Sequence, residues 1–190
     1  MKTICIRVVL GALLLAPAAA FALVPGQWTG PYVGVQAGVN RTNLDQFSSE
    51  NAFTAGIRAG YDAQISDHFV VGGDVFYEWN QDTNHQTCIA GAGCASVNLG
   101  SKVYGVEGKI GFPLGPTDNF MPYVKLGYSH LDVTGDNASG SDNAVRYGVG
   151  IAWSLIDSTT LSLQYTHGKY GSDVGNWKND NVTVGLNFHF

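Results

Sequence analysis

The feature of this sequence that most constrains its fold is an alternation of side-chain character in eight segments of about ten residues each. In the first segment, Val33, Val35 and Ala37 share one parity, and Gly34 and Gln36 share the other. The segments cover residues 31–40, 53–62, 69–80, 104–112, 123–129, 145–154, 161–168 and 182–190. Successive side chains of a β-strand point to opposite faces, so the pattern predicts eight strands, each with an apolar and a polar face.

Composition and the connections between the segments indicate the same architecture. The chain has 25 glycines, 12% aromatic and 13% charged residues, and no extended period of 3.6 residues. Short connections are expected near residue 67 and at 113–119 and 156–159, and longer ones at 41–52, 81–99, 133–142 and 171–180. Tilted strands of this length can cross a bilayer, and alternating short and long connections are typical of bacterial outer-membrane barrels. The sequence therefore predicts an all-β fold, an eight-stranded, antiparallel, up-and-down transmembrane β-barrel.

The first 22 residues have the organisation of a secretory signal peptide. Lys2 and Arg7 precede an apolar run at residues 8–19, and residues 20–22 supply a small-x-small cleavage pattern. A membrane anchor helix is the alternative, but Pro17 interrupts a run already shorter than the roughly 20 residues that a spanning helix needs. We expect residues 1–22 to be cleaved and residues 23–190 to form one exported barrel domain.

Cleavage would remove two of the 10 basic and none of the 15 acidic residues, leaving 8 − 15 = −7 charges over 190 − 22 = 168 residues. An acidic balance without a cluster of Lys or Arg predicts no nucleic-acid partner. No motif in the sequence indicates a cofactor.

Two cysteines, Cys88 and Cys94, follow the predicted leader. In an exported protein they fold in an oxidising compartment, which predicts a disulfide between them. The alternative is a metal site, but two thiols with His85 nearby form an incomplete set for a structural tetrahedral site. Four aspartates lie in the predicted loops: Asp136, Asp142, Asp173 and Asp180. Their spacing does not match a regular calcium loop, so no metal site is predicted.

The charged residues inside the segments bear on which face meets lipid. The seven that lie well inside the segments all share the polar parity: Arg58, Asp74, Glu78, Glu107, Lys109, Lys125 and Arg146. A Lys or Arg facing lipid at the bilayer midplane costs about 2–4 kcal/mol, so a membrane barrel turns such residues inward. A soluble lipocalin-like barrel remains the alternative, because there these residues would face water and the apolar face a ligand.

Aromatic residues on the apolar parity favour the membrane barrel. One predicted band near the outer rim contains Phe53, Tyr77, Trp79, Tyr104, Tyr128, Tyr147 and Tyr165. A second band near the inner rim contains Tyr61, Phe69, Phe112, Trp153 and Phe190. Tyr and Trp prefer the lipid headgroup boundary, whereas a soluble barrel has no reason to place them in rings. The narrow interior of an eight-stranded barrel then predicts that the inward charges form a salt-bridge network rather than an ion path.

Three stretches resemble a known family. Residues 28–38 (WTGPYVGVQAG) resemble the first strand of the opacity-porin and OmpA-like group of small outer-membrane barrels, and residues 161–171 (LSLQYTHGKYG) its penultimate strand. Residues 182–190 (VTVGLNFHF) resemble its last strand, which ends on the assembly signal Phe190. The resemblance implies a cell outer-membrane location, contact with outer-membrane lipid and lipopolysaccharide, and insertion by the barrel assembly machinery. It carries over no catalytic residue.

Three functions follow as hypotheses. The first, which we predict, is a non-enzymatic surface protein whose loops contact host or cell-surface ligands, with the Cys88–Cys94 loop as the candidate contact surface. The second is a lipid A-modifying enzyme with His167 as its base, although Lys169 stands where that lipase class has the Ser of His-x-Ser. The third is a narrow channel for small solutes.

Overall fold

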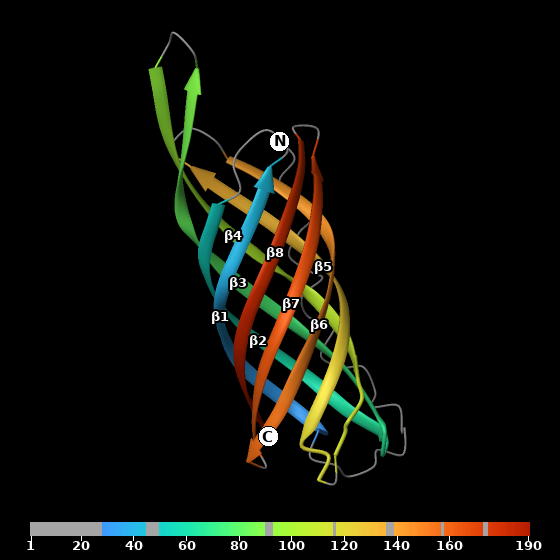
Figure 1. Cartoon of the computed structure of the whole chain (residues 1–190). Coiled ribbons are helices and arrows are strands. Elements are labelled where there is room, and N and C mark those ends of the chain that lie inside the picture. Colours follow the sequence, from blue (N-terminus) through green and yellow to red (C-terminus); the bar gives the residue numbers. More distant parts are fainter. Residues whose placement is uncertain are drawn as a thin grey trace, which may run out of the picture.

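The computed structural model describes residues 28–44, 50–89, 93–115, 117–135, 139–156, 158–172 and 175–190. These residues form a closed antiparallel barrel in which each strand pairs with the next and β8 pairs with β1 (Figure 1). The strands are β1 (Gly30–Leu44), β2 (Glu50–Ser66), β3 (Phe69–Ile89), β4 (Gly93–Gly111), β5 (Phe120–Gly135), β6 (Ser139–Ile156), β7 (Thr159–Ser172) and β8 (Gly175–His189). The predicted eight-stranded antiparallel barrel is thereby confirmed. The predicted signal peptide lies outside the described residues, and so do the side chains of Cys88 and Cys94.

The two faces of the barrel wall have opposite character. On β1, Val35 is 56% exposed on the outside, whereas the neighbouring Gln36 is 4% exposed inside. The same alternation follows the other strands, so that the outer wall carries Val, Ile, Leu and aromatic side chains and the interior carries most of the buried polar ones. The usual globular arrangement is therefore inverted, and the barrel presents an apolar surface on its outside, as barrels whose outer wall faces lipid do. No helix in the described parts of the chain has the length and apolar character to span a bilayer.

The strands are longer than the alternating segments, at 14 to 21 residues. Much of what the sequence predicts as longer loops is paired strand. In the predicted loop 41–52, for example, β1 continues to Leu44 and β2 begins at Glu50. Backbone hydrogen bonding between the strands continues beyond the part of the wall that faces lipid. The alternation of apolar and polar residues, on which the prediction depends, ends at that boundary.

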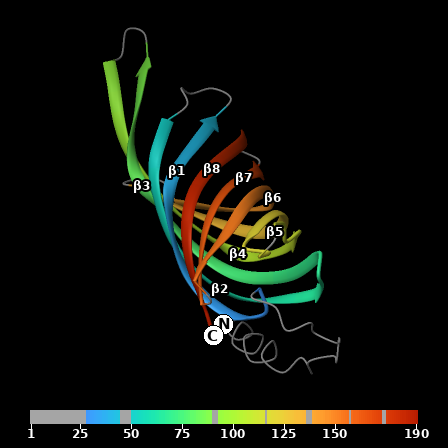
Figure 2. The same cartoon turned by 60° about the horizontal axis from the view of Figure 1, so that its bottom comes forward.

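The hairpin of β3 and β4 projects beyond the rest of the barrel (Figures 1 and 2). The pairing of β3 with β2 ends at Asn80, and the pairing of β4 with β5 begins at Leu99. Residues 84–89 and 93–98 pair with each other and with no further strand among the described residues. We call this two-stranded segment the ribbon. The end of the barrel from which it projects is the ribbon end, and the end where β1 begins and β8 finishes is the terminal end.

Candidate functional site

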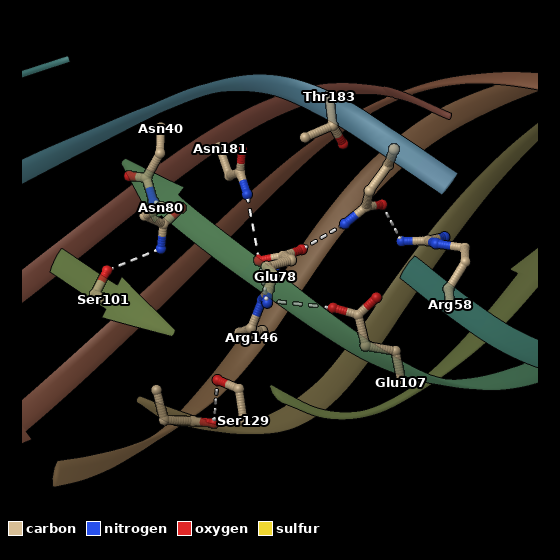
Figure 3. A network of polar contacts seen from close by, with 12 residues as sticks. Asn40, Arg58, Glu78, Asn80, Ser101, Glu107, Ser129, Arg146, Asn181 and Thr183 are labelled. Atoms are coloured by element: carbon tan, nitrogen blue, oxygen red, sulfur yellow. Dashed lines mark hydrogen bonds and ion pairs between the residues drawn. The ribbon is translucent and has the colours of Figure 1, made fainter. Parts of the chain in front are cut away.

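The interior of the barrel holds an ion-paired network at its centre (Figure 3). Arg146 on β6 donates from Nη1 and Nη2 to the two carboxylate oxygens of Glu78 on β3, at 3.0 and 3.1 Å. Its Nε lies 3.5 Å from Oε1 of Glu107 on β4. Lys125 on β5 completes this part with an Nζ–Oε2 distance of 2.6 Å to Glu107. The alternation of each strand brings these four side chains, each at most 5% exposed, into one volume.

An amide links this centre to a second charged group. Gln36 donates from Nε2 to Glu78 at 2.7 Å and accepts from Nη2 of Arg58 at 2.7 Å. Arg58 in turn lies 3.8 Å from Asp74, which also accepts a 2.8 Å hydrogen bond from the hydroxyl of Tyr32. A planar guanidinium with several donors suits such branching contacts better than an ammonium would.

The remaining inward cation, Lys109, pairs with a residue outside the predicted set. Its Nζ lies 2.8 Å from Oδ2 of Asp62 on β2, and Asp62 is 1% exposed. With Asp62 included, the ion-paired network among the described residues contains four cations and four anions, 4 − 4 = 0. Asp62 shares the polar parity of its segment, so the signal was present in the sequence, but it stands at the last position of the alternation.

Two apolar clusters flank the charged centre. Toward the terminal end, Trp28, Val70, Met121, Tyr123 and Ala152 pack together, and Trp28 donates from Nε1 to the carbonyl of Asp118 at 2.7 Å. Toward the ribbon end, the second cluster consists of Phe76, Val103, Leu131, Ala144 and Tyr170. The sequence pattern does not predict a role for these inward apolar residues, because the inward face of each strand is recognised in the sequence by its polar residues. Their rings and methyl groups place apolar layers in the interior on both sides of the charged centre.

Cationic side chains also lie against the inward aromatic rings. Lys109 Nζ is 4.7 Å from the ring centroid of Tyr32, and the guanidinium carbon of Arg146 is 4.4 Å from that of Phe76. Such contacts add attraction where little water screens the charge. In the described part of the interior, the four cations and four anions of the network thus form ion pairs with one another. Among the described side chains, no group of three or more His, Cys, Asp or Glu is placed to hold a metal ion.

The outer surface near the ribbon end holds a second polar cluster. His167 Nδ1 lies 2.7 Å from Oδ1 of Asp180, and the hydroxyl of Tyr165 donates to the same oxygen at 2.5 Å. The ring of Tyr147 lies 5.1 Å from that of His167. His167 therefore has the acidic partner that the lipid A enzyme hypothesis requires, but position 169, on the same face, is an exposed Lys.

Aromatic residues surround both ends of the apolar wall. Near the ribbon end, the ring of Tyr77 lies 4.8 Å from Trp79 and 6.1 Å from Tyr104. Near the terminal end, Phe69 and Phe112 are in edge contact at 5.2 Å. Two levels of aromatic side chains on a hydrophobic wall are typical of a protein that lies across a bilayer.

Comparison with known proteins assigns the class. The family model described as the outer membrane protein beta-barrel domain matches residues 8–190, and the chain belongs to this family. Neisserial surface protein A aligns with a TM-score of 0.60 at 16% identity, over 85% of this chain and 98% of that one. A comparison with curated proteins found no match.

Two further solved structures share the fold. Ail, the attachment invasion locus protein of Yersinia pestis, has a TM-score of 0.57 at 14% identity, over 85% of this chain and 99% of that one. OprG from Pseudomonas aeruginosa has a TM-score of 0.52 at 14% identity, over 87% and 98% of the two chains. The likeness confirms the resemblance to small bacterial outer-membrane barrels, and at these identities it concerns the fold alone.

Proposed function

We propose that this chain is an exported, non-enzymatic surface protein whose barrel anchors the ribbon outside the cell. The observation that carries the proposal is the register, since residues 84–89 and 93–98 continue the β3–β4 ladder after the pairing with both flanking strands has ended. Bacterial outer-membrane barrels keep their short turns in the periplasm, which supports an orientation with the ribbon end outside. A rigid scaffold that holds a projecting hairpin suits contact with another molecule.

The proposal includes a route to the membrane. The predicted signal peptide at residues 1–22 would direct export, and Phe190, 78% exposed at the end of the last strand, would be read by the barrel assembly machinery. The outer leaflet of that membrane would bring lipopolysaccharide against the apolar wall.

The other two hypotheses have less support. A channel requires a continuous polar path, but apolar clusters flank a charge-balanced centre; a stable conductance step from the refolded protein in a planar bilayer would contradict this closed interior. A lipid A hydrolase requires a nucleophile beside its base, and Lys169 occupies the position of the serine.

The partner of the ribbon belongs to the surface of a host or of another cell. The Ail structure was also determined in complex with the heparin analogue sucrose octasulfate, which suggests sulfated glycans as a first probe. We therefore choose immobilised heparin and basement-membrane matrix as the surfaces to test.

The experiment removes the ribbon without touching the barrel. Thr83 and Leu99 are directly paired, so an Asn-Gly turn can replace residues 84–98 between them. The control places Asn-Gly at residues 67–68, in the turn between β2 and β3 at the terminal end. Adhesion of cells that express each form is measured, together with outer-membrane fractionation and heat-dependent gel mobility.

We expect both variants to insert and fold, and only the ribbon-deleted variant to lose adhesion. Full adhesion by that variant contradicts the proposal. So does wild-type adhesion that is no greater than that of cells without the protein on either surface.

A further inference from the structure

A compact group of cations lies on the outer wall at the ribbon end. Arg41 on β1 is paired in register with Asp180 on β8, and Asp180 is paired with His167 on β7. One step further from the membrane, Lys178 on β8 is paired directly with Lys169 on β7. These five residues share the outward parity of the apolar wall, and Arg41, Lys169 and Lys178 are exposed.

The pairing of the two lysines is unfavourable by itself. Residues directly opposite on antiparallel strands have Cβ atoms about 4.5–5.5 Å apart, and like charges in this arrangement destabilise the pair. Among the described side chains, no carboxylate forms an ion pair with either lysine. An anion bound between them would remove the repulsion.

The group contains one acid, Asp180, which is paired in register with Arg41 and with His167. Asp180 uses Oδ1 for both His167 and Tyr165, at 2.7 and 2.5 Å. Counting Arg41, Lys169 and Lys178 against Asp180 gives 3 − 1 = +2 with His167 neutral, in a chain whose formal charge is −5. This part of the surface is therefore positive on an acidic protein.

An apolar groove begins directly below the cations. Tyr165 and Val182, each two residues along the strand from His167 and Asp180, line it together with Val149, Ile151 and Leu163. The groove follows the outer wall across β5, β6, β7 and β8. Cations above an apolar groove match a molecule with a phosphate head and an acyl tail.

We propose that Arg41, Lys169 and Lys178 form a binding site for the phosphate of an outer-leaflet phosphorylated glycolipid, whose acyl chain lies in this groove. The site rests on the proposed outer-membrane orientation, because only the ribbon end meets that leaflet. Tyr147 and Tyr165 border it at headgroup level, where their polar ends remain hydrated. The contact with Asp180 holds the imidazole ring of His167 beside the phosphate. Binding requires no nucleophile, so the site binds lipid without cleaving it.

The test compares two variants that remove lysines from the outer wall. Lys169→Gln/Lys178→Gln removes the facing cations, and Lys102→Gln removes an exposed, outward-facing lysine on β4, opposite Asp132. Purified protein in detergent is titrated with diphosphorylated lipid A, its monophosphorylated form and phosphatidylglycerol, and bound lipid is measured by native mass spectrometry. A parallel arm adds inorganic phosphate as competitor.

We expect the double variant to bind diphosphorylated lipid A about thirtyfold more weakly than wild type, and Lys102→Gln to bind like wild type. Equal binding by wild type and double variant, or equal loss in Lys102→Gln, overturns the site. Competition by inorganic phosphate alone assigns it to a free anion, and equally tight phosphatidylglycerol overturns the choice of glycolipid. Heat-dependent mobility and outer-membrane fractionation of the double variant report on the barrel separately, so the two proposals fail independently.

Discussion

At the scale of single residues, small and large inward side chains are matched across the barrel. A Cβ added at Gly150 would overlap the ring of Tyr123, and one added at Gly148 would come within 3.1 Å of Cε of Lys125. Alternation predicts which glycines point inward, but it cannot say which ring or ammonium fills the space. That depends on strand stagger, which brings residues far apart in the sequence to one level.

The contact at Gly150 gives a prediction about packing. Gly150→Ala should destabilise the barrel by about 1–3 kcal/mol, because Tyr123 must move within a filled interior. The measurement is the urea midpoint of unfolding in lipid vesicles. Gly140→Ala is the control, since a Cβ there meets nothing within 4 Å. Equal midpoints for both variants and wild type would show that the interior is not packed as described.

A second prediction concerns the ion pair at the centre. Glu78→Gln removes the bidentate partner of Arg146 and should cost about 3 kcal/mol of folding free energy, because the buried network then contains one cation more than it has anions. Asp67→Asn removes an exposed acid from a turn and should change little.

The double variant Glu78→Leu/Arg146→Met tests the cause of this loss. Removing both charges should destabilise the barrel less than Glu78→Gln does, because no lone charge remains. A double variant as unstable as the sum of its single substitutions would speak against coupling between the two residues.

At the scale of the strands, alternation predicts the lipid-facing centre of each one but not its ends. Residues 31–40 were predicted for the first strand, and the structure extends it to Leu44. The alternation arises from lipid on one side only, so it stops at the membrane boundary while pairing continues. The ribbon is the largest example: residues 81–99 were predicted as a loop, and most of them are paired strand.

The ribbon also bears on the cysteine prediction. Cys88 and Cys94 are directly paired near its tip, a register that brings their Cα atoms to about 4.5–5.5 Å, within the range of a disulfide. An isolated two-stranded hairpin is only marginally stable in water, so a cross-link there would stabilise it.

We expect protein purified without reductant to lack free thiols at both positions and to lose protease resistance in the ribbon after Cys88→Ser/Cys94→Ser. Thiol alkylation followed by mass spectrometry, with limited proteolysis, makes both measurements. Thr87→Ser serves as the control, because it makes a small polar change beside the pair and leaves both cysteines in place. Two alkylated cysteines in the folded, unreduced protein would contradict the disulfide.

At the scale of the whole molecule, the barrel has an apolar outer face and an interior filled by side chains, in which the charges of the ion-paired network balance. The sequence predicts this much because the lipid solvent imposes one rule on every strand. The polar cluster on the outer wall at the ribbon end was only partly predictable from the sequence. His167 was singled out, but its contact with Asp180 and the pairing of the two lysines depend on the register of the strands. Function at the ribbon depends on a partner that the same rule does not specify.

The central claim is that lipid, and not an enclosed ligand, covers the apolar wall. The most direct measurement is the nuclear Overhauser effect between lipid acyl chains and protein methyl groups in nanodiscs. We predict cross-peaks from the acyl chains to the outward Val35, Val75, Leu126, Leu163 and Val184, and none to the inward Val103 or Leu131. Acyl contacts confined to Val103 and Leu131, with water cross-peaks to the outward methyl groups, would contradict the account.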